Sequence, residues 1–131
     1  MKIKFVPLED VLLIHEMIIE ATGGQVGVWD FALFHSTISR PQASFAGKDL
    51  YSTIFDKAAA LIHSLLLNHP FNDGNKRTSL ATTERFLNIN SIKIIATQKE
   101  KVKFTLDIES KKLNLSQIAI WLRKHSKKLR R

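Results

Sequence analysis

The stretch from Ser52 to Asn68 is the most apolar in this chain, and it constrains the fold more than any other feature. Its apolar residues lie on most faces of a helix instead of forming one stripe: Ile54, Phe55, Ala58, Ala59, Ala60, Leu61, Ile62, Leu65, Leu66 and Leu67. A helix of this kind is buried by other elements on nearly every side. The sequence therefore predicts a central helix with the rest of the chain packed around it.

The segment before the central helix also has helical spacing. Apolar residues recur every three to four positions over Leu8 to Ile19, directly after Pro7, and Gly23 follows the end of this pattern. Asp30 is placed to cap a short helix that ends near Pro41. Two helices are therefore expected before the central one.

The remaining segments complete the pattern. Helices are predicted over residues 75–90, 100–109 and 116–124. The short segment 92–96 is rich in β-branched residues and is predicted to be extended. Residues 43–50 are predicted to form an exposed loop or a small hairpin. No internal repeat or linker divides the chain. The expected fold is a single compact all-α domain with few β residues.

Composition excludes several classes of protein. The chain has 131 residues, of which 44% are hydrophobic, and this suits one globular domain. It has no cysteine, which excludes a disulfide scaffold, a thiolate nucleophile and a cysteine-based metal site. It has no apolar run near the ~20 residues that span a bilayer, and its first residues lack the features of a secretory signal. We therefore expect a cytoplasmic protein without membrane contact.

The net charge of +8 is concentrated near the C-terminus. Residues 111–131 carry eight Lys and Arg and no Asp or Glu, so the first 110 residues are balanced in charge. A segment of this kind either contacts nucleic acid or an acidic partner, or forms a solvated last helix and an exposed tail. A nucleic-acid-binding domain spreads its charge over a face, so nucleic acid is the less favoured partner.

Residues 69–78, with the sequence His-Pro-Phe-Asn-Asp-Gly-Asn-Lys-Arg-Thr, differ in kind from the rest of the chain. They lie between the central helix and the next one, where a purely structural connection needs only a turn residue or two. Gly74 lets the backbone approach a ligand, and Lys76 and Arg77 add positive charge to a helix start whose free N–H groups already favour anions. The segment therefore predicts a phosphate site.

Two side chains of the same segment add chemistry to the phosphate site. Asp73 is placed to hold a divalent cation that bridges phosphate oxygens. His69 leaves the central helix toward the same place, and an imidazole suits proton abstraction near neutral pH. The simpler interpretation of His69 is a helix C-cap without a catalytic role.

The segment resembles the signature of the Fic/Doc superfamily, His-x-Phe-x-(Asp/Glu)-Gly-Asn-(Gly/Lys)-Arg, and Lys76 is similar to the lysine of its death-on-curing (Doc) branch. Earlier stretches also resemble Doc-type toxins, namely residues 22–24, 39–42, 45–51 and 55–59. The resemblance covers roughly residues 3–95. It implies a Fic/Doc-like helical domain at residues 1–125, followed by a basic tail at residues 126–131.

The resemblance implies a role for each motif residue. His69 would take the proton from a target hydroxyl, Phe71 would be buried and shape the loop, and Asp73 would bind Mg²⁺. The remaining four would bind the phosphates of the nucleotide: Gly74, Asn75, Lys76 and Arg77.

The resemblance also implies an activity that uses ATP and Mg²⁺ to modify a Thr or Ser hydroxyl of a protein. Most Fic proteins transfer AMP, whereas lysine at the position of Lys76 is associated in the Doc branch with a reversed nucleotide and transfer of the γ-phosphoryl group. The target class of that branch is elongation factor Tu, whose phosphorylation stops translation. The expected protein is the toxin of a toxin–antitoxin pair, inhibited by an antitoxin that covers the site.

Two positions depart from the family's patterns. Gly74 stands where Doc loops often have alanine, and Leu80 stands where many Fic proteins have a further arginine. These departures leave AMP transfer open as an alternative to phosphoryl transfer. The alternative from another class is a non-catalytic module that binds nucleic acid or a partner through the basic C-terminus.

Residues outside the motif have two interpretations each. Four belong to a stretch that is similar to the family's target-docking flap, or form ordinary surface: Phe45, Lys48, Asp49 and Tyr51. Arg40 either closes a turn or reaches the pocket. Three histidines have no partner at a motif spacing and are expected in the core or on the surface: His15, His35 and His63.

Overall fold

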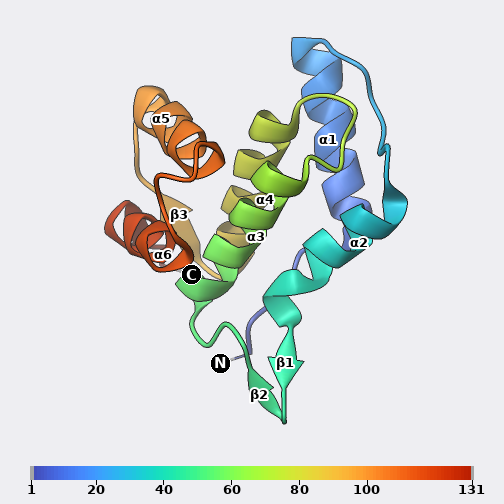
Figure 1. Ribbon diagram of the computed structural model, residues 1–131. Coiled ribbons are helices and arrows are strands. Elements are labelled where there is room, and N and C mark those ends of the chain that lie inside the picture. Colours follow the sequence, from blue (N-terminus) through green and yellow to red (C-terminus); the bar gives the residue numbers. More distant parts are fainter. Residues whose placement is uncertain (1, 131) are drawn as a thin grey trace.

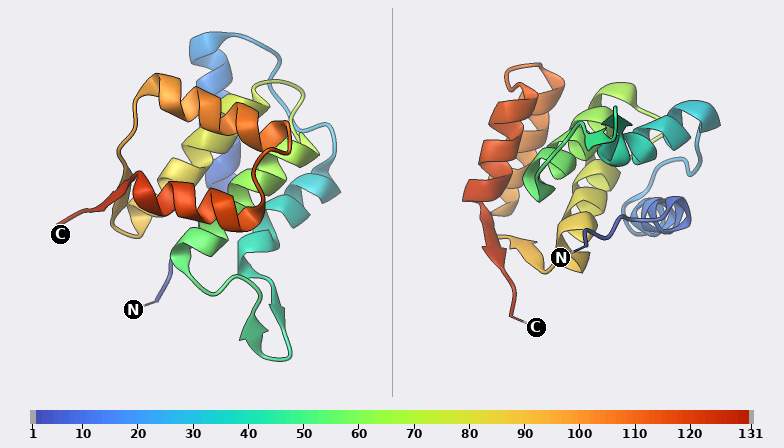
Figure 2. Two further views of the ribbon diagram at one scale, coloured as in Figure 1. Left: turned by 60° about the vertical axis from the view of Figure 1, so that its left-hand side comes forward. Right: turned by 90° about the horizontal axis from the view of Figure 1, so that it is seen from below.

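The structure, a computed structural model, describes residues 2–130. Its helices are arranged in layers around a central helix. Its six α-helices are α1 (Leu8–Thr22), α2 (Phe31–Ser39), α3 (Ile54–Asn68), α4 (Asn75–Ile89), α5 (Gln98–Glu109) and α6 (Leu115–Lys124). Helix α3 lies in the middle beside α4, with α1 and α2 on one side and α5 and α6 on the other (Figures 1 and 2). The predicted all-α fold class is confirmed.

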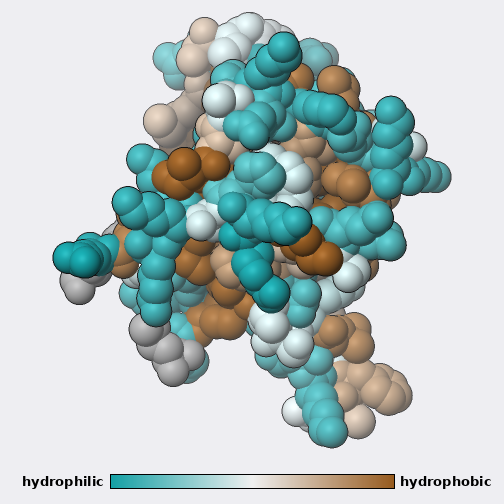
Figure 3. Space-filling view, turned by 90° about the vertical axis from the view of Figure 1, so that its left-hand side faces the viewer, coloured by the Kyte–Doolittle hydropathy of each residue, from teal (hydrophilic) through white to brown (hydrophobic). Residues whose placement is uncertain are grey.

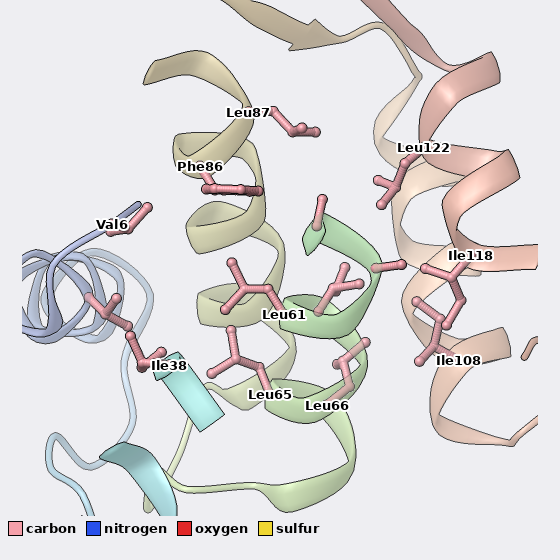
Figure 4. Close-up of a cluster of buried hydrophobic side chains, with 14 of the residues drawn as sticks. Val6, Ile38, Leu61, Leu65, Leu66, Phe86, Leu87, Ile108, Ile118 and Leu122 are labelled. Atoms are coloured by element: carbon pink, nitrogen blue, oxygen red, sulfur yellow. The ribbon is translucent and has the colours of Figure 1, made fainter. Parts of the chain in front are cut away.

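The core surrounds α3, as the apolar pattern of this helix predicts. Leu61, Leu65 and Leu66 are at most 3% exposed, and they point toward neighbouring elements on both sides (Figure 4). The side chains that cover them come from the flanking helices and include Ile38, Phe86, Leu87, Ile108, Ile118 and Leu122. Complete burial of one leucine contributes roughly 1.5–3 kcal/mol, so the burial of these three leucines is a large contribution to the stability of the domain.

Side-chain caps determine where the helices begin. Thr53 Oγ1 accepts the Asp56 N–H at 3.1 Å, and the Asp56 carboxylate accepts the Thr53 N–H in return. This capping box starts α3 at Ile54, two residues later than the apolar pattern indicates. Capping boxes also start α5 and α6 slightly earlier than the predicted residues 100 and 116.

Residues 40–50 connect α2 to α3. A 3-10 turn, η1 (Arg40–Gln42), leads into an antiparallel hairpin of β1 (Ser44–Phe45) and β2 (Lys48–Asp49), with Phe45 opposite Lys48. Of the two alternatives for residues 43–50, the structure therefore has the small hairpin. The hairpin projects from the end of α3 that lies far from the α3–α4 loop (Figure 1).

The C-terminal segment forms a strand where the sequence analysis expected an exposed tail. Strand β4 (Ser126–Lys128) pairs antiparallel with β3 (Ile92–Ile94), with Lys127 opposite Lys93. The Leu129 N–H also donates to the Ser91 carbonyl at 2.7 Å. The basic side chains therefore extend from a paired backbone, on a face that is mostly hydrophilic (Figure 3). Residue 131 of the predicted tail, like residue 1, lies outside the described residues.

In the region 2–130, none of the helices combines the length and the apolar composition that crossing a bilayer requires.

The β3–β4 pairing predicts that removal of the last six residues destabilises the domain. A chain that ends at His125 loses the backbone hydrogen bonds between β4 and β3 and the bond from Leu129 to Ser91. Each such bond makes a net contribution of about 1 kcal/mol, so we expect the free energy of unfolding to fall by about 2 kcal/mol or more. Urea unfolding would measure this loss. The control is the double variant Lys127→Ala/Lys128→Ala, which keeps the backbone and should unfold like the unmodified chain. Equal stability of the truncated and full chains would contradict the pairing.

Candidate active site

A pocket of about 820 Å³ opens where the C-terminal ends of α3 and α5 meet the N-terminal end of α4. The end of α5 lies beside the α3–α4 loop, as Figure 2 shows. Ten residues line this pocket: Trp29, Asn68, His69, Phe71, Asn72, Gly74, Asn75, Lys76, Arg77 and Glu109. The structure therefore brings most of the predicted site residues together in one cavity.

His69 is the C-cap of α3 and also lines the pocket. It caps the C-terminal end of α3 in the left-handed conformation, with φ 47° and ψ 60°, which non-glycine residues rarely adopt. The Trp29 indole N–H donates to the His69 carbonyl and holds the backbone there. The imidazole itself is 54% exposed at the pocket. A group in this position can reach a bound substrate.

Glu109, the last residue of α5, is a site residue that the sequence analysis missed. Its Oε2 lies 2.9 Å from His69 Nε2, and its Oε1 lies 3.4 Å from Lys76 Nζ. Its side chain is only 20% exposed. No motif spacing points to Glu109, because it lies 40 residues after His69 in the part of the chain where the family resemblance fades.

Two residues of the motif brace the loop. Asn75 Oδ1 accepts the Phe71 N–H at 3.1 Å, and Asn75 Nδ2 donates to the Phe71 carbonyl at 3.0 Å. The side-chain amide of Asn75 is therefore engaged by the loop backbone, and its backbone N–H is the part available to a phosphate. Phe71 is 2% exposed, and its ring lies 5.3 Å from that of Phe34.

His15 of α1 holds the same loop from below. Its ring stacks on Phe71 at a centroid distance of 4.1 Å, its Nε2 accepts the Gly27 N–H at 3.3 Å, and its Nδ1 lies 3.1 Å from Thr78 Oγ1. Because Nε2 accepts a hydrogen bond, Nδ1 carries the proton and the ring is neutral. Burial is the largest cause that lowers the pKa of His15, and the nearby charge of Arg77 lowers it further.

The start of α4 supplies the predicted phosphate-binding features. Gly74 is the N-cap residue in a left-handed conformation with φ 70°, and a Cβ there would lie 2.9 Å from the Ile19 side chain. The N–H groups of the first turn that follows have no partner within the helix. Lys76 is half exposed beside them, and the Arg77 guanidinium donates to Thr22 Oγ1 and to the Gly23 carbonyl.

Asp73 directly precedes Gly74 but is not among the residues that line the pocket. Its Oδ2 accepts the Gln25 N–H at 3.0 Å, so the loop between α1 and α2 fixes this carboxylate. Within residues 2–130 no cluster of three or more His, Asp or Glu could hold a metal ion by itself. A single exposed carboxylate next to a phosphate site still fits Mg²⁺, which is often held by one or two carboxylates and substrate phosphates.

The four candidate flap residues do not line the pocket. Two of them anchor the hairpin, because Asp49 pairs with the buried Lys57 at 3.0 Å and the Tyr51 hydroxyl accepts from Arg40 Nε at 2.8 Å. The other two, Phe45 and Lys48, are exposed, and Phe45 is 77% exposed.

Arg40 serves the turn and not the pocket. Besides Tyr51 it contacts Ser64 and His63 of α3, with 3.1 Å between Arg40 Nη1 and His63 Nδ1. Burial lowers the pKa of His63, and the Arg40 charge lowers it further. His35 is exposed on α2.

This fold and this loop define the class of the protein. The sequence model of the Fic/DOC family matches residues 5–87, which include α1 to most of α4 and the whole motif. The chain belongs to the Fic/DOC family, and the resemblance seen in the motif is confirmed.

Two relatives are similar to the chain beyond the motif. One is named toxin Doc, from Mycolicibacterium smegmatis, and is 42% identical over 93 residues, which cover 71% of this chain and 69% of the relative. The other is named protein kinase doc, from Escherichia phage P1, and is 28% identical over 116 residues, which cover 88% of this chain and 90% of the relative.

The buried His15 predicts a loss of stability in mild acid. Its folded-state pKa is lowered, so the unfolded chain binds a proton below about pH 6.5 that the folded chain resists. The free energy of unfolding should therefore be highest above that pH and fall below it, by at most ~1.4 kcal/mol for each pH unit and each such histidine. Urea unfolding at pH 7.5 and pH 5 measures the difference.

His15→Gln tests the assignment, because an amide can keep both hydrogen bonds without titrating. We expect a smaller acid loss in this variant, with a remainder from His63, whose pKa is also lowered. His35→Gln is the matched control at an exposed position. If His15→Gln and the unmodified chain lose the same free energy of unfolding in acid, the buried His15 is not the source of that loss.

Proposed function

We propose that this protein is a toxin-type transferase that moves the γ-phosphoryl group of ATP to a Thr or Ser hydroxyl of a protein target. Membership of the Fic/DOC family and the names of the two relatives, toxin Doc and protein kinase doc, support this role. One observation carries the proposal: an exposed imidazole and a cationic helix start line the same pocket. A base and a phosphate site in one pocket are what transfer to a hydroxyl requires.

The residues of the pocket divide the reaction between them. His69 takes the proton from the attacking hydroxyl, whose oxygen forms a bond to the γ-phosphorus while the bond to the ADP oxygen breaks. Lys76, Arg77 and the free N–H groups of the first turn of α4 bind the phosphoryl oxygens and offset their charge. The volume of about 820 Å³ lies within the range of pockets that hold small-molecule ligands.

Asp73 is the residue that would hold Mg²⁺ in the proposed reaction. When bound, this cation neutralises charge on the phosphate oxygens. The hydrogen bond from the Gln25 N–H fixes the Asp73 carboxylate one residue before the proposed phosphate site, which begins at Gly74. Asp73 therefore acts by position and charge, and ATP with Mg²⁺ is the proposed cofactor pair.

We propose elongation factor Tu as the target, translation arrest as the consequence, and the cytoplasm as the location, all on the strength of the family resemblance. The hairpin bears on this target. Helix α3 has 15 residues and is about 22 Å long, and the hairpin and His69 lie at its opposite ends (Figure 1). A target that contacts both places must be a macromolecule, as a protein substrate is.

The partner that we propose for regulation is an antitoxin that covers the pocket, because the pocket is open to solvent and its basic residues attract an acidic chain. Nucleic acid remains the less favoured partner. The charge of the C-terminal part sits partly on β4, on a different element from the pocket.

The first test of the function is His69→Ala. General base catalysis contributes about 10²–10⁴-fold, so we expect transfer to fall by that factor while ATP binding and the fold persist. The measurement is transfer of label from γ-labelled ATP to a protein of a bacterial translation lysate. Growth arrest on expression should disappear with the activity. A His69→Ala protein that remains active and toxic would rule out the base assigned here.

The second test separates phosphoryl transfer from AMP transfer. Lys76 places a cation and four methylenes over the first turn of α4, where a glycine would leave room for the terminal phosphates, so we expect the γ-phosphate to face His69. Label from γ-labelled ATP should then reach the target, and label from α-labelled ATP should not. Lys76→Gly should weaken phosphoryl transfer and admit some AMP transfer.

AMP transfer is the second candidate because Gly74, the N-cap of α4, matches the motif glycine of Fic transferases, and a glycine lets the backbone approach a ligand. Transfer of α-label by the unmodified protein would make it the correct function. A protein that transfers neither label, and instead retains RNA or an acidic partner, would support the non-catalytic alternative.

A further inference from the structure

Glu109 is an acidic residue in a pocket that otherwise suits anions, and this placement calls for an explanation. It lies at the C-terminal end of α5, where the helix dipole disfavours a negative charge. The same helix has no basic residue in its last turn. The carboxylate is therefore stabilised by its partners across the pocket, His69 and Lys76, and not by its own helix.

The contact with His69 determines where the imidazole proton lies. Glu109 Oε2 is 2.9 Å from His69 Nε2, and two lone pairs at that distance would repel each other. The carboxylate accepts the Nε2 proton, and a neutral ring bonded in this way has its lone pair on Nδ1. The ring is thus held in one tautomer and one orientation before any substrate binds.

We propose that Glu109 is a positioning residue of the transfer reaction, which holds His69 with Nδ1 free to act as the base and holds Lys76 within reach of the same reaction. This inference rests on the function proposed above. When the hydroxyl proton moves to Nδ1, the imidazole becomes a cation, and the carboxylate at Nε2 stabilises it as the oxygen–phosphorus bond forms and ADP leaves.

The second carboxylate oxygen connects the base to the phosphate site. Glu109 Oε1 lies 3.4 Å from Lys76 Nζ, and an ammonium group has three donors, so Lys76 can contact this oxygen and a phosphate together. One carboxylate therefore sets the separation between the proton acceptor and the cation that binds the transferred group.

The end of α5 is suited to this task because its inner face is fixed in the core. Ile108, the residue before Glu109, is completely buried, and Phe104 one turn earlier is 1% exposed. These contacts fix the backbone from which the Glu109 side chain extends. A carboxylate on a mobile loop would hold the imidazole with less accuracy.

The kinetic test compares Glu109→Gln and Glu109→Ala with Asp107→Asn. Asp107 lies on the same helix and pairs with Lys103 at 2.8 Å, outside the pocket, so it is the matched control. We expect kcat with γ-labelled ATP to fall about 10- to 100-fold in Glu109→Ala, part of the 10²–10⁴-fold effect of a general base. KM for ATP should change less than kcat, because Lys76 keeps its charge. Glu109→Gln should lower kcat in the same direction, and Asp107→Asn should leave it unchanged.

The spectroscopic test needs no activity. In the protein alone, the ¹⁵N chemical shifts of the neutral His69 ring should report a proton fixed on Nε2, and in Glu109→Ala they should move toward a mixture of the two tautomers. Asp107→Asn should leave these shifts as they are. Unchanged His69 shifts in Glu109→Ala would overturn the proposal, and so would an unchanged or increased kcat, since an increase would mean that the carboxylate obstructs the site.

The two tests separate this proposal from the function on which it rests. If the unmodified protein transfers no label, the proposed function fails, while the ¹⁵N shifts still decide whether Glu109 orients His69. If the unmodified protein transfers label and Glu109→Ala does so equally well, the function stands and the positioning role is overturned.

Discussion

The stacked contact between His15 and Phe71 is the interaction on which the site depends. It joins α1 to the motif loop at a centroid distance of 4.1 Å, and both rings are almost completely buried. Loss of a buried phenylalanine side chain costs roughly 3–5 kcal/mol, which is a large part of the stability of a domain of this size. The loop is therefore held by its buried ring, and the residues between Phe71 and α4 can face solvent without losing their geometry.

The charged side chains at the pocket are held by contacts within the protein. Arg77 is tied to the end of α1, Lys76 is paired with Glu109, and Glu109 also binds the imidazole of His69. Each cation thus has an oxygen partner in the protein and still lies at a helix start, whose free N–H groups favour anions. Under the proposed function, cations held in place in this way need no rearrangement when a phosphate binds, which is the condition under which charge stabilises a transition state most.

Helices were predictable from the sequence because their determinants are local. The apolar run of α3 and the capping residues of α2 and α5 lie within a few positions of the structure they produce. The motif loop was predictable for the same reason, since its base, its glycine and its cations share ten consecutive residues. The β3–β4 pairing joins segments more than 30 residues apart, and basic side chains that face solvent gave no sign of it.

Site residues from distant segments could not be predicted in this way. His15 and Glu109 reach the loop only because α1 packs on α4 and α5 ends beside the α3–α4 connection. Neither has a partner at a helical or motif spacing, so the sequence gives them no more meaning than any histidine or glutamate. Arg40 is a different case, because the sequence allows it either to close a turn or to reach the pocket, and its contacts with Tyr51 and His63 place it at the turn.

Helix α3 connects the pocket at His69 to the hairpin of β1 and β2. Its C-terminal end carries His69, and its N-terminal end carries Lys57, whose ion pair with Asp49 and contact with the Tyr51 carbonyl hold the hairpin. The middle of the helix is buried in a close-packed core, and such a core deforms little. The length of α3 therefore sets the spacing between the pocket and the base of the hairpin. Under the proposed function, a protein target that contacts both ends must match that spacing, and the few residues around His69 select the atom that reacts.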